Sequence, residues 1–153
     1  MTKRFNIRVY GLLFNEEQSL LVSDELIKGL QFTKLLGGGL EWGEGTIDGL
    51  KREFMEELEQ PIEVIEHYFT TDYFQVSAFN PNDQLMSIYY KVRMLGPQQF
   101  SVKEKAFDFP DEQGNPLEVQ RWIPWEELTP DAFKWPVDQL VIKKILAAGR
   151  AAV

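Results

Sequence analysis

The segment from residue 47 to residue 58 constrains the fold more than any other part of the chain. At about 100° per residue, an α-helix over this segment places four apolar side chains on one stripe: Ile47, Leu50, Phe54 and Leu58. Three carboxylates fall on an adjacent face: Glu53, Glu56 and Glu57. The pattern therefore predicts a helix that packs its stripe on a sheet and presents an acidic face beside it.

Clustered carboxylates at helical spacing repel one another, at a cost of a few tenths of a kcal/mol per pair. A hard divalent cation with oxygen ligands offsets this cost, which indicates Mg²⁺ or Mn²⁺. Arg52 is four residues from Asp48 and four from Glu56, so we expect it to orient a carboxylate. The alternative interpretation is a solvated acidic helix face.

Glycines precede this helix at positions 37, 38, 39, 43 and 45. They allow a tight loop and a close approach of the backbone to a ligand. No Gly-Lys-Ser/Thr ends the loop, which excludes a P-loop, and Trp42 occupies the place of the third glycine of a dinucleotide-binding fingerprint.

The spacing over the whole region is more specific than any of its parts. Gly38 is followed by five residues and Glu44, then by seven residues and Arg52-Glu53-Phe54-Met55-Glu56-Glu57. This pattern resembles the signature box of the Nudix hydrolases (MutT-like domains). The family's box ends in glycine and an aliphatic residue, where this chain has Glu59 and Gln60. We expect either a positive φ at Glu59 or a different helix end before Pro61.

The resemblance implies roles for the residues that match the box. The metal ligands would be the Gly38 carbonyl, Glu53, Glu56 and Glu57, and Arg52 would complete the catalytic group within the box. Gly39 and Glu44 would support the loop and the ligand helix. The implied cofactor is Mg²⁺ or Mn²⁺, and the substrate-binding residues are unknown.

A further catalytic carboxylate is expected outside the box. Glu118 precedes a short strand predicted over residues 119–123, and we choose it as a general base or an additional ligand. Four acidic residues of a polar loop compete for this role: Glu104, Asp108, Asp111 and Glu112. The only histidine, His67, is expected to have a structural or surface role.

Composition limits the other possibilities. A chain of 153 residues that is 44% hydrophobic suits one domain over residues 1–153. The net charge of −8 argues against duplex nucleic acid as a partner, and the absence of cysteine excludes disulfides and thiolate metal sites. No stretch is apolar for the length of a membrane span, so we expect a cytoplasmic protein without a membrane partner. The oligomeric state is unknown.

The rest of the chain predicts an α/β fold. Residues 5–14 and 19–22 read as two paired strands around a turn at residues 15–18, and residues 62–75 are rich in β-formers. Residues 86–94 alternate apolar and polar side chains, with Met86 on the apolar face, as in a half-buried strand. Pro136 begins a final helix with one apolar face: Val137, Leu140, Val141 and Ile145. This order resembles the Nudix α/β/α sandwich with a mixed β-sheet.

The predicted function is metal-dependent hydrolysis of a diphosphate (pyrophosphate) linkage in a small-molecule nucleoside diphosphate derivative, by attack of water at phosphorus. The alternative is a non-catalytic Nudix-fold module that binds a nucleotide sugar or ADP-ribose. Nucleoside triphosphates, dinucleoside polyphosphates, ADP-ribose and nucleotide sugars all remain possible substrates.

Overall fold

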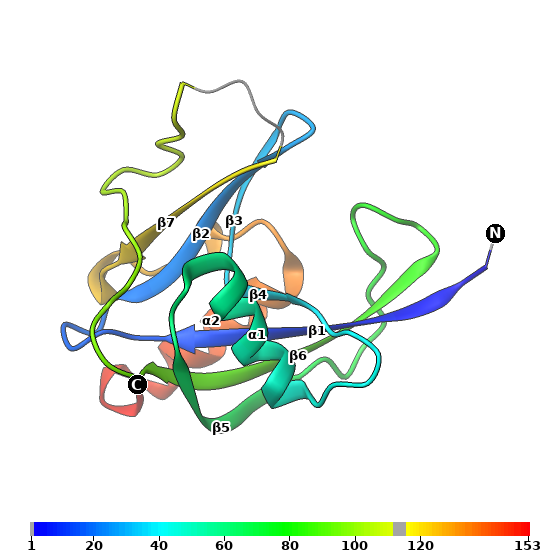
Figure 1. The fold of residues 1–153 in the computed structure, drawn as a ribbon, viewed down its shortest axis with the longest axis horizontal. Helices are drawn as coiled ribbons and strands as arrows, with labels where there is room; N and C mark the ends of the chain where they lie inside the picture. Colours follow the sequence, from blue (N-terminus) through cyan, green and yellow to red (C-terminus); the bar gives the residue numbers. More distant parts are fainter. Residues whose placement is uncertain (1, 112–115) are drawn as a thin grey trace. The chain divides into compact units, whose positions relative to one another are not determined.

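The computed structural model describes residues 2–111 and 116–153, which form two compact units. The first unit comprises residues 2–12 and 37–99, and the second comprises residues 13–36 and the described residues from 100 onward. Each unit thus combines two separate stretches of the chain, as the colours of Figure 1 show. The expectation of one domain over residues 1–153 stays a prediction.

The first unit contains a four-stranded sheet in the order β4-β1-β6-β5. These strands are β4 (Leu36–Gly39), β1 (Arg4–Leu13), β6 (Asp83–Met94) and β5 (Ile62–Thr70).

This sheet is mixed. β1 and β6 run in the same direction, because the Arg4 N–H donates to the Asn82 carbonyl at 3.0 Å at their starts and Gly11 lies against Val92 towards their ends. β4 runs against β1, with the Leu40 N–H donating to the Ile7 carbonyl at 2.8 Å. β5 is antiparallel to β6. The predicted α/β class with a mixed sheet is therefore confirmed.

The predicted box helix is α1 (Thr46–Leu58). Leu50, Phe54 and Leu58 are buried as predicted, whereas Ile47, in the first turn, is 43% exposed. The prediction was thus wrong for Ile47, and the apolar contact begins one turn later. A Cβ on Gly11 would come within 2.8 Å of the Phe54 ring, so the glycine lets the helix pack closely on β1.

The end of α1 resolves the two alternatives for Glu59. Its backbone is left-handed, with φ 52° and ψ 30°, and its N–H donates to the Met55 carbonyl at 3.0 Å. Gln60, in the place of the family's aliphatic residue, is fully buried. Its side-chain oxygen accepts a hydrogen bond from the Gln99 N–H at 2.8 Å, which satisfies the buried amide.

In the first half of β6 the buried face is not the predicted apolar one, whereas Val92 of the predicted face is buried further along the strand. Ser87 and Tyr89 are buried, whereas Met86 is 40% exposed. Tyr89 stacks on Tyr10 of β1 with ring centroids 5.2 Å apart, which places the tyrosine in the core.

The second unit contains an antiparallel sheet in the order β3-β2-β7. These strands are β3 (Leu30–Lys34), β2 (Leu20–Ile27) and β7 (Leu117–Ile123).

The predicted pairing of residues 19–22 with residues 5–14 was wrong apart from one bridge, between Phe14 and Leu20. β2 pairs instead with β3, through a two-residue turn at Lys28 and Gly29 with φ 52° and 77°. Positive φ at both positions is the type I′ geometry that suits the twist of a hairpin, and Lys-Gly is a weaker sequence signal for it than Asn-Gly.

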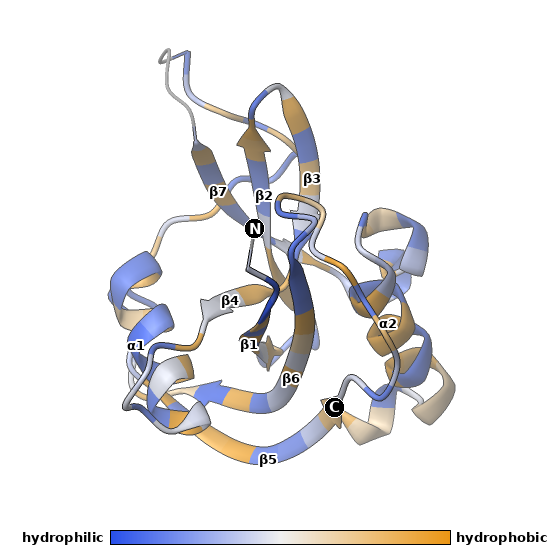
Figure 2. Cartoon of the chain, turned by 90° about the vertical axis from the view of Figure 1, so that its right-hand side faces the viewer, coloured by the Kyte–Doolittle hydropathy of each residue, from blue (hydrophilic) through white to orange (hydrophobic). Residues whose placement is uncertain are grey.

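The final helix is α2 (Pro136–Ala148), with Pro136 in its first turn as predicted. Its buried apolar residues are Val137, Val141, Ile142 and Ile145, so Ile142 replaces the predicted Leu140. Figure 2 shows apolar and polar residues on this helix. Three short 3₁₀ helices complete the unit: η1 (Trp125–Glu127), η2 (Pro130–Ala132) and η3 (Arg150–Ala152). Among the described residues, no helix combines the length and hydropathy needed to cross a membrane.

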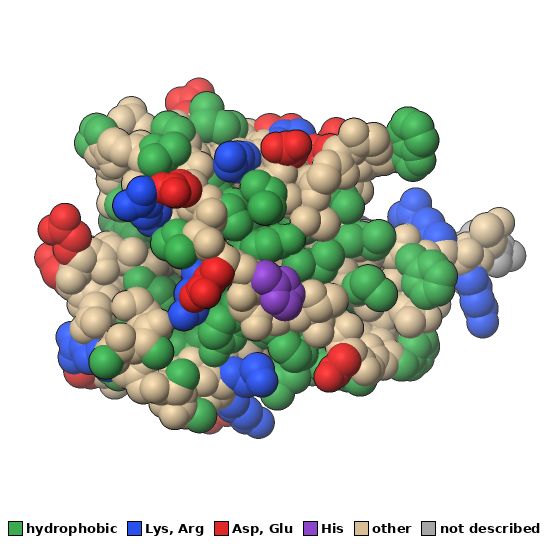
Figure 3. All heavy atoms as spheres, turned by 90° about the horizontal axis from the view of Figure 1, so that it is seen from below, with side chains coloured by type: hydrophobic (Ala, Val, Ile, Leu, Met, Phe, Trp, Pro, Cys, Tyr) green, Lys and Arg blue, Asp and Glu red, His purple; other side chains and the backbone are tan. Residues whose placement is uncertain are grey.

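His67 is exposed, as Figure 3 shows, and its Nε2 lies 2.7 Å from the Thr70 hydroxyl. This surface position agrees with the role expected for it.

Candidate active site

Arg52 holds the box loop onto α1 within the first unit. Its Nε and Nη2 donate to the two carboxylate oxygens of Glu44 at 2.9 and 2.6 Å. The Glu41 N–H also donates to Glu44, at 2.8 Å. These bonds, the Arg52 hydrogen bonds foremost, lower the pKa of Glu44 to about 2. The loop is therefore fixed by a carboxylate that is ionised at neutral pH.

Arg52 also reaches the predicted ligand residues. Nη1 donates to Glu53 and to Glu56, both at 3.1 Å, and Nη2 donates to the Gly39 carbonyl at 3.0 Å. Hydrogen bonding to Glu44 and the neighbouring carboxylates raise the pKa of Arg52. The pairing with Glu56 is the predicted one, whereas Glu44 takes the place expected for Asp48.

Gly38 lies directly against Glu53. A Cβ on Gly38 would come within 2.6 Å of the Glu53 carboxylate, so only glycine lets the β4 backbone approach this side chain so closely. The start of α1 is held separately, by a 2.6 Å hydrogen bond between the hydroxyls of Thr46 and Tyr90. The first contact joins the β4 backbone to α1, and the second joins the start of α1 to β6.

The donor set fits a hard divalent cation in its chemistry. It consists of carboxylate and carbonyl oxygens, and Glu53 is only 12% exposed, while Oε2 of Glu57 is buried. No group of three or more acidic or histidine side chains among the described residues is arranged as a metal site. The Arg52 guanidinium forms ion pairs with both Glu53 and Glu56.

Glu118 lies in the second unit, at the start of β7. It accepts hydrogen bonds from the Ser23 hydroxyl at 2.8 Å and from Gln120 Nε2 at 3.1 Å. Ser23 also lies 3.5 Å from the carboxylate of Glu25, which forms a buried ion pair with Lys34 at 3.2 Å. Burial raises the pKa of Glu25, and the nearby Glu118 raises it further while Lys34 lowers it.

These neighbours of Glu118 were not identified from the sequence. Ser23, Glu25 and Lys34 lie on adjacent strands, and their strand pairing is the only signal that could have grouped them. Among the competing loop acids, three have exposed side chains: Glu104, Asp108 and Asp111. The fourth, Glu112, lies outside the described residues.

A family profile described as the NUDIX domain matches residues 4–144. The chain belongs to this family. The match spans residues of both units and confirms the resemblance inferred from the box. No curated protein matches the sequence.

Several solved structures share the fold of this chain. A NUDIX hydrolase from Nitrosomonas europaea superimposes with a TM-score of 0.69 at 17% identity, covering 96% of this chain and 92% of its own. The E. coli ORF135 protein gives a TM-score of 0.69 at 18% identity, covering 98% and 94%. An ADP-ribose pyrophosphatase from Streptococcus suis gives 0.53 at 14% identity, covering 92% and 91%. These similarities confirm the predicted Nudix fold, and the predicted class of Nudix pyrophosphohydrolase agrees with the family.

Proposed function

We propose that this Nudix protein hydrolyses a diphosphate linkage in a small nucleoside diphosphate derivative, with Mg²⁺ or Mn²⁺ as cofactor. The observation that carries the proposal is the gathering of Glu44, Glu53 and Glu56 around Arg52, beside Gly38 and Gly39. One structural neighbour is named an ADP-ribose pyrophosphatase and another a UDP-X diphosphatase, which supports this substrate class.

Four groups of the first unit would hold the divalent cation: the Gly38 carbonyl and the carboxylates of Glu53, Glu56 and Glu57. When bound, such a cation supplies charge neutralisation for a diphosphate and a more acidic water. Arg52 orients Glu53 and Glu56 through its two 3.1 Å hydrogen bonds and fixes the loop through Glu44. The box therefore provides oxygen ligands on a rigid frame.

The reaction needs a group that removes a proton from the attacking water. The water oxygen forms a bond to phosphorus, the bond from phosphorus to the bridging oxygen breaks, and the phosphorylated leaving group departs. We assign the proton acceptor to the carboxylate of Glu118, which Ser23 and Gln120 hold by hydrogen bonds.

The remaining assignments follow from charge and composition. The net charge of −8 supports a small-molecule substrate rather than duplex nucleic acid, and a cytoplasmic location without a membrane partner is part of the proposal.

A substrate panel with Mg²⁺ or Mn²⁺ tests the function: nucleoside triphosphates, dinucleoside polyphosphates, ADP-ribose and nucleotide sugars. Turnover in ¹⁸O-labelled water identifies the attacked phosphorus from the labelled product, and Glu57→Gln serves as the control for background hydrolysis. The proposal expects turnover of at least one nucleoside diphosphate derivative by the wild type alone. Tight binding of a panel member without turnover would instead establish the non-catalytic module.

A further inference from the structure

A guanidinium lies beside the glycines of β4, on the face of this strand opposite Glu53. Successive residues of a strand point to opposite faces of the sheet. A Cβ on Gly38 would meet the Glu53 carboxylate, whereas a Cβ on Gly39 would lie 3.7 Å from Nη1 of Arg8, which belongs to β1. The β4 backbone therefore runs between a predicted metal ligand and a cation to which the proposed reaction assigns no role.

A buried tyrosine fixes the position of this guanidinium. Nε of Arg8 donates to the Tyr10 hydroxyl at 2.7 Å, and Cζ lies 5.7 Å from the centre of the same ring. Tyr10 is 9% exposed and stacks on Tyr89 in the core, while Arg8 is half-buried. The guanidinium is therefore held beside Gly39 by a rigid anchor, as a preorganised binding residue requires.

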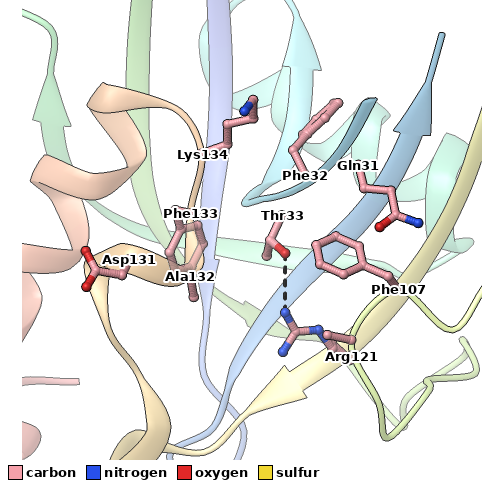
Figure 4. Close-up of a pocket in the computed structure, with 10 residues that line it drawn as sticks. Gln31, Phe32, Thr33, Phe107, Arg121, Asp131, Ala132, Phe133 and Lys134 are labelled. Atoms are coloured by element: carbon pink, nitrogen blue, oxygen red, sulfur yellow. Dashed lines mark hydrogen bonds between the residues drawn. The ribbon is translucent and has the colours of Figure 1, made fainter. Parts of the chain in front are cut away.

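Tyr10 orients Arg8 without adding a negative charge, because a phenol hydroxyl is uncharged when it forms this bond. Arg121 of the second unit has the opposite arrangement. Its Nε donates to the fully buried carboxylate of Asp24 at 2.6 Å, and Figure 4 shows its guanidinium directed at Thr33. The anchor of Arg121 therefore neutralises its charge, whereas the bond to Tyr10 leaves Arg8 positive.

Arg52, the guanidinium of the box, is already engaged by carboxylates. It pairs with four of them: Glu41, Glu44, Glu53 and Glu56. A diphosphate carries several negative charges, and the planar fork of an arginine binds phosphate oxygens through parallel N–H groups. Arg8 takes no part in these four ion pairs, so it suits an anionic ligand at the box better than Arg52 does.

The strand between Glu53 and Arg8 leaves room for such a ligand. β4 lies at the edge of its sheet, and its last three residues are Gly37, Gly38 and Gly39. Glycine within a strand often marks a place where a ligand approaches the backbone closely. Because glycine has no side chain, β4 itself places nothing between Glu53 on one face and Arg8 on the other. One small anion can therefore reach both side chains across this edge.

We propose that Arg8 is a substrate-binding residue that selects a diphosphate over a monophosphate. Its guanidinium donates to one phosphate group while the linked phosphate lies at the box carboxylates, and Tyr10 positions it for this contact. A single phosphate at the box does not reach Arg8 and gains nothing from it. This inference rests on the proposed diphosphate substrate and adds a residue outside the box that recognises it.

Calorimetric titration of the full chain in Mg²⁺ with methylenediphosphonate and with inorganic phosphate tests the proposal. Methylenediphosphonate has two linked phosphorus groups and cannot be hydrolysed, so binding is measured apart from turnover. Arg8→Met keeps the length of the side chain and removes its charge. It should weaken methylenediphosphonate binding about tenfold or more, through loss of charge-assisted hydrogen bonds, and leave phosphate binding unchanged. The matched control is Arg93→Met, which removes an exposed guanidinium of the same sheet that pairs with Glu63, and should leave both affinities unchanged.

Tyr10→Phe provides a second variant if Arg8→Met fails to fold. It keeps the ring that stacks on Tyr89 and removes only the hydroxyl that orients Arg8, so methylenediphosphonate should bind about two- to tenfold more weakly. Unchanged affinity in both variants, an equal loss for phosphate and methylenediphosphonate, or no binding of methylenediphosphonate by the wild type would each overturn the proposal. Binding that depends on Arg8 in a protein that hydrolyses no member of the substrate panel would support it and contradict only the proposed function.

Discussion

Two clusters of charged residues in this molecule have opposite ratios of hydrogen-bond donors to carboxylates. In the first unit, one guanidinium, Arg52, pairs with four glutamates: Glu41, Glu44, Glu53 and Glu56. In the second unit, one carboxylate, Asp24, accepts from three donors: Arg121, Thr33 and the Phe107 N–H. The Arg52 cluster therefore has more carboxylates than its one guanidinium can neutralise, whereas the single carboxylate of the Asp24 cluster is fully paired.

Exposure and pairing distinguish carboxylates that can bind a ligand from carboxylates that stabilise the fold. Asp24 is fully buried and saturated with donors, which suits a structural role. The Arg52 cluster is partly exposed, and Glu56 is 57% exposed. The group around Glu118 resembles the Arg52 cluster, because Glu118 is exposed and lies near a second carboxylate, Glu25, which pairs with Lys34.

The largest expected effect is on turnover, from Glu118→Gln. If Glu118 accepts the proton of the attacking water, kcat should fall by about 10²–10⁴ with little change in KM. Steady-state kinetics on a substrate found in the panel measures this, with Glu104→Gln as the control in the polar loop. Normal turnover in Glu118→Gln together with an inactive loop variant would show that a carboxylate of the polar loop is the proton acceptor.

Asp24→Asn should be the most destabilising of the changes. It leaves Arg121 without its buried partner, which costs about 3–5 kcal/mol of unfolding free energy. Urea denaturation measures the loss, and Asp111→Asn, at an exposed carboxylate, should stay near the wild-type value. A loss below about 1 kcal/mol, the range of exposed ion pairs, would remove the distinction between the two clusters.

Glu56→Gln and Glu57→Gln should each lower turnover at least about 100-fold, by analogy with the loss of one electrostatic catalytic group. Their stability should stay equal or rise by a few tenths of a kcal/mol, because like charges no longer repel. The matched control is Glu41→Gln, which removes a carboxylate of the same Arg52 cluster that is not a predicted ligand. Near-normal rate and Mn²⁺ affinity in either box variant would show that the ligand assignment is wrong.

A smaller effect is expected at the end of α1. Glu59 has a φ of 52°, so Glu59→Gly should stabilise the fold by up to about 1 kcal/mol. Lys28, in the second unit, has the same φ and provides the matched change Lys28→Gly. Thermal melts should show both variants more stable, and a lower melting temperature for Glu59→Gly would mean that its side chain contributes more than the strain costs.

Acidification should affect two glutamates in opposite directions. The pKa of Glu44 is lowered to about 2, so its contribution to stability is present above its ordinary pKa and is lost as the pH falls towards 2. The pKa of Glu25 is raised by burial, so its ionised form opposes folding and protonation relieves this as the pH falls.

Urea midpoints measured from pH 6 to pH 2 test this opposition. Glu44→Gln should reduce the stability that is lost as the pH falls. Glu25→Gln should remove the stability that is gained when Glu25 is protonated. Parallel changes in the two variants would contradict the assignment.

Local signals predicted the elements that local physics controls. The helical spacing of Leu50, Phe54 and Leu58 predicted the buried stripe of α1, and Pro136 predicted the start of α2. The same reasoning failed for β2, whose partner strands β3 and β7 depend on a weak turn signal at Lys28-Gly29 and on residues about a hundred positions away. Strand pairing of this kind depends on contacts that the sequence alone does not rank.

The sequence by itself determined the family and the box, because these depend on residue types at fixed spacings along one helix and its loop. Only the tertiary structure decided which partner each charge takes. Arg52 pairs with Glu44 and not with Asp48, Glu118 accepts a hydrogen bond from Ser23, and the buried Asp24 forms an ion pair with Arg121. The reason is physical: an ion pair or a buried hydrogen bond requires atoms within about 3 Å, and that distance is set by how strands and loops pack.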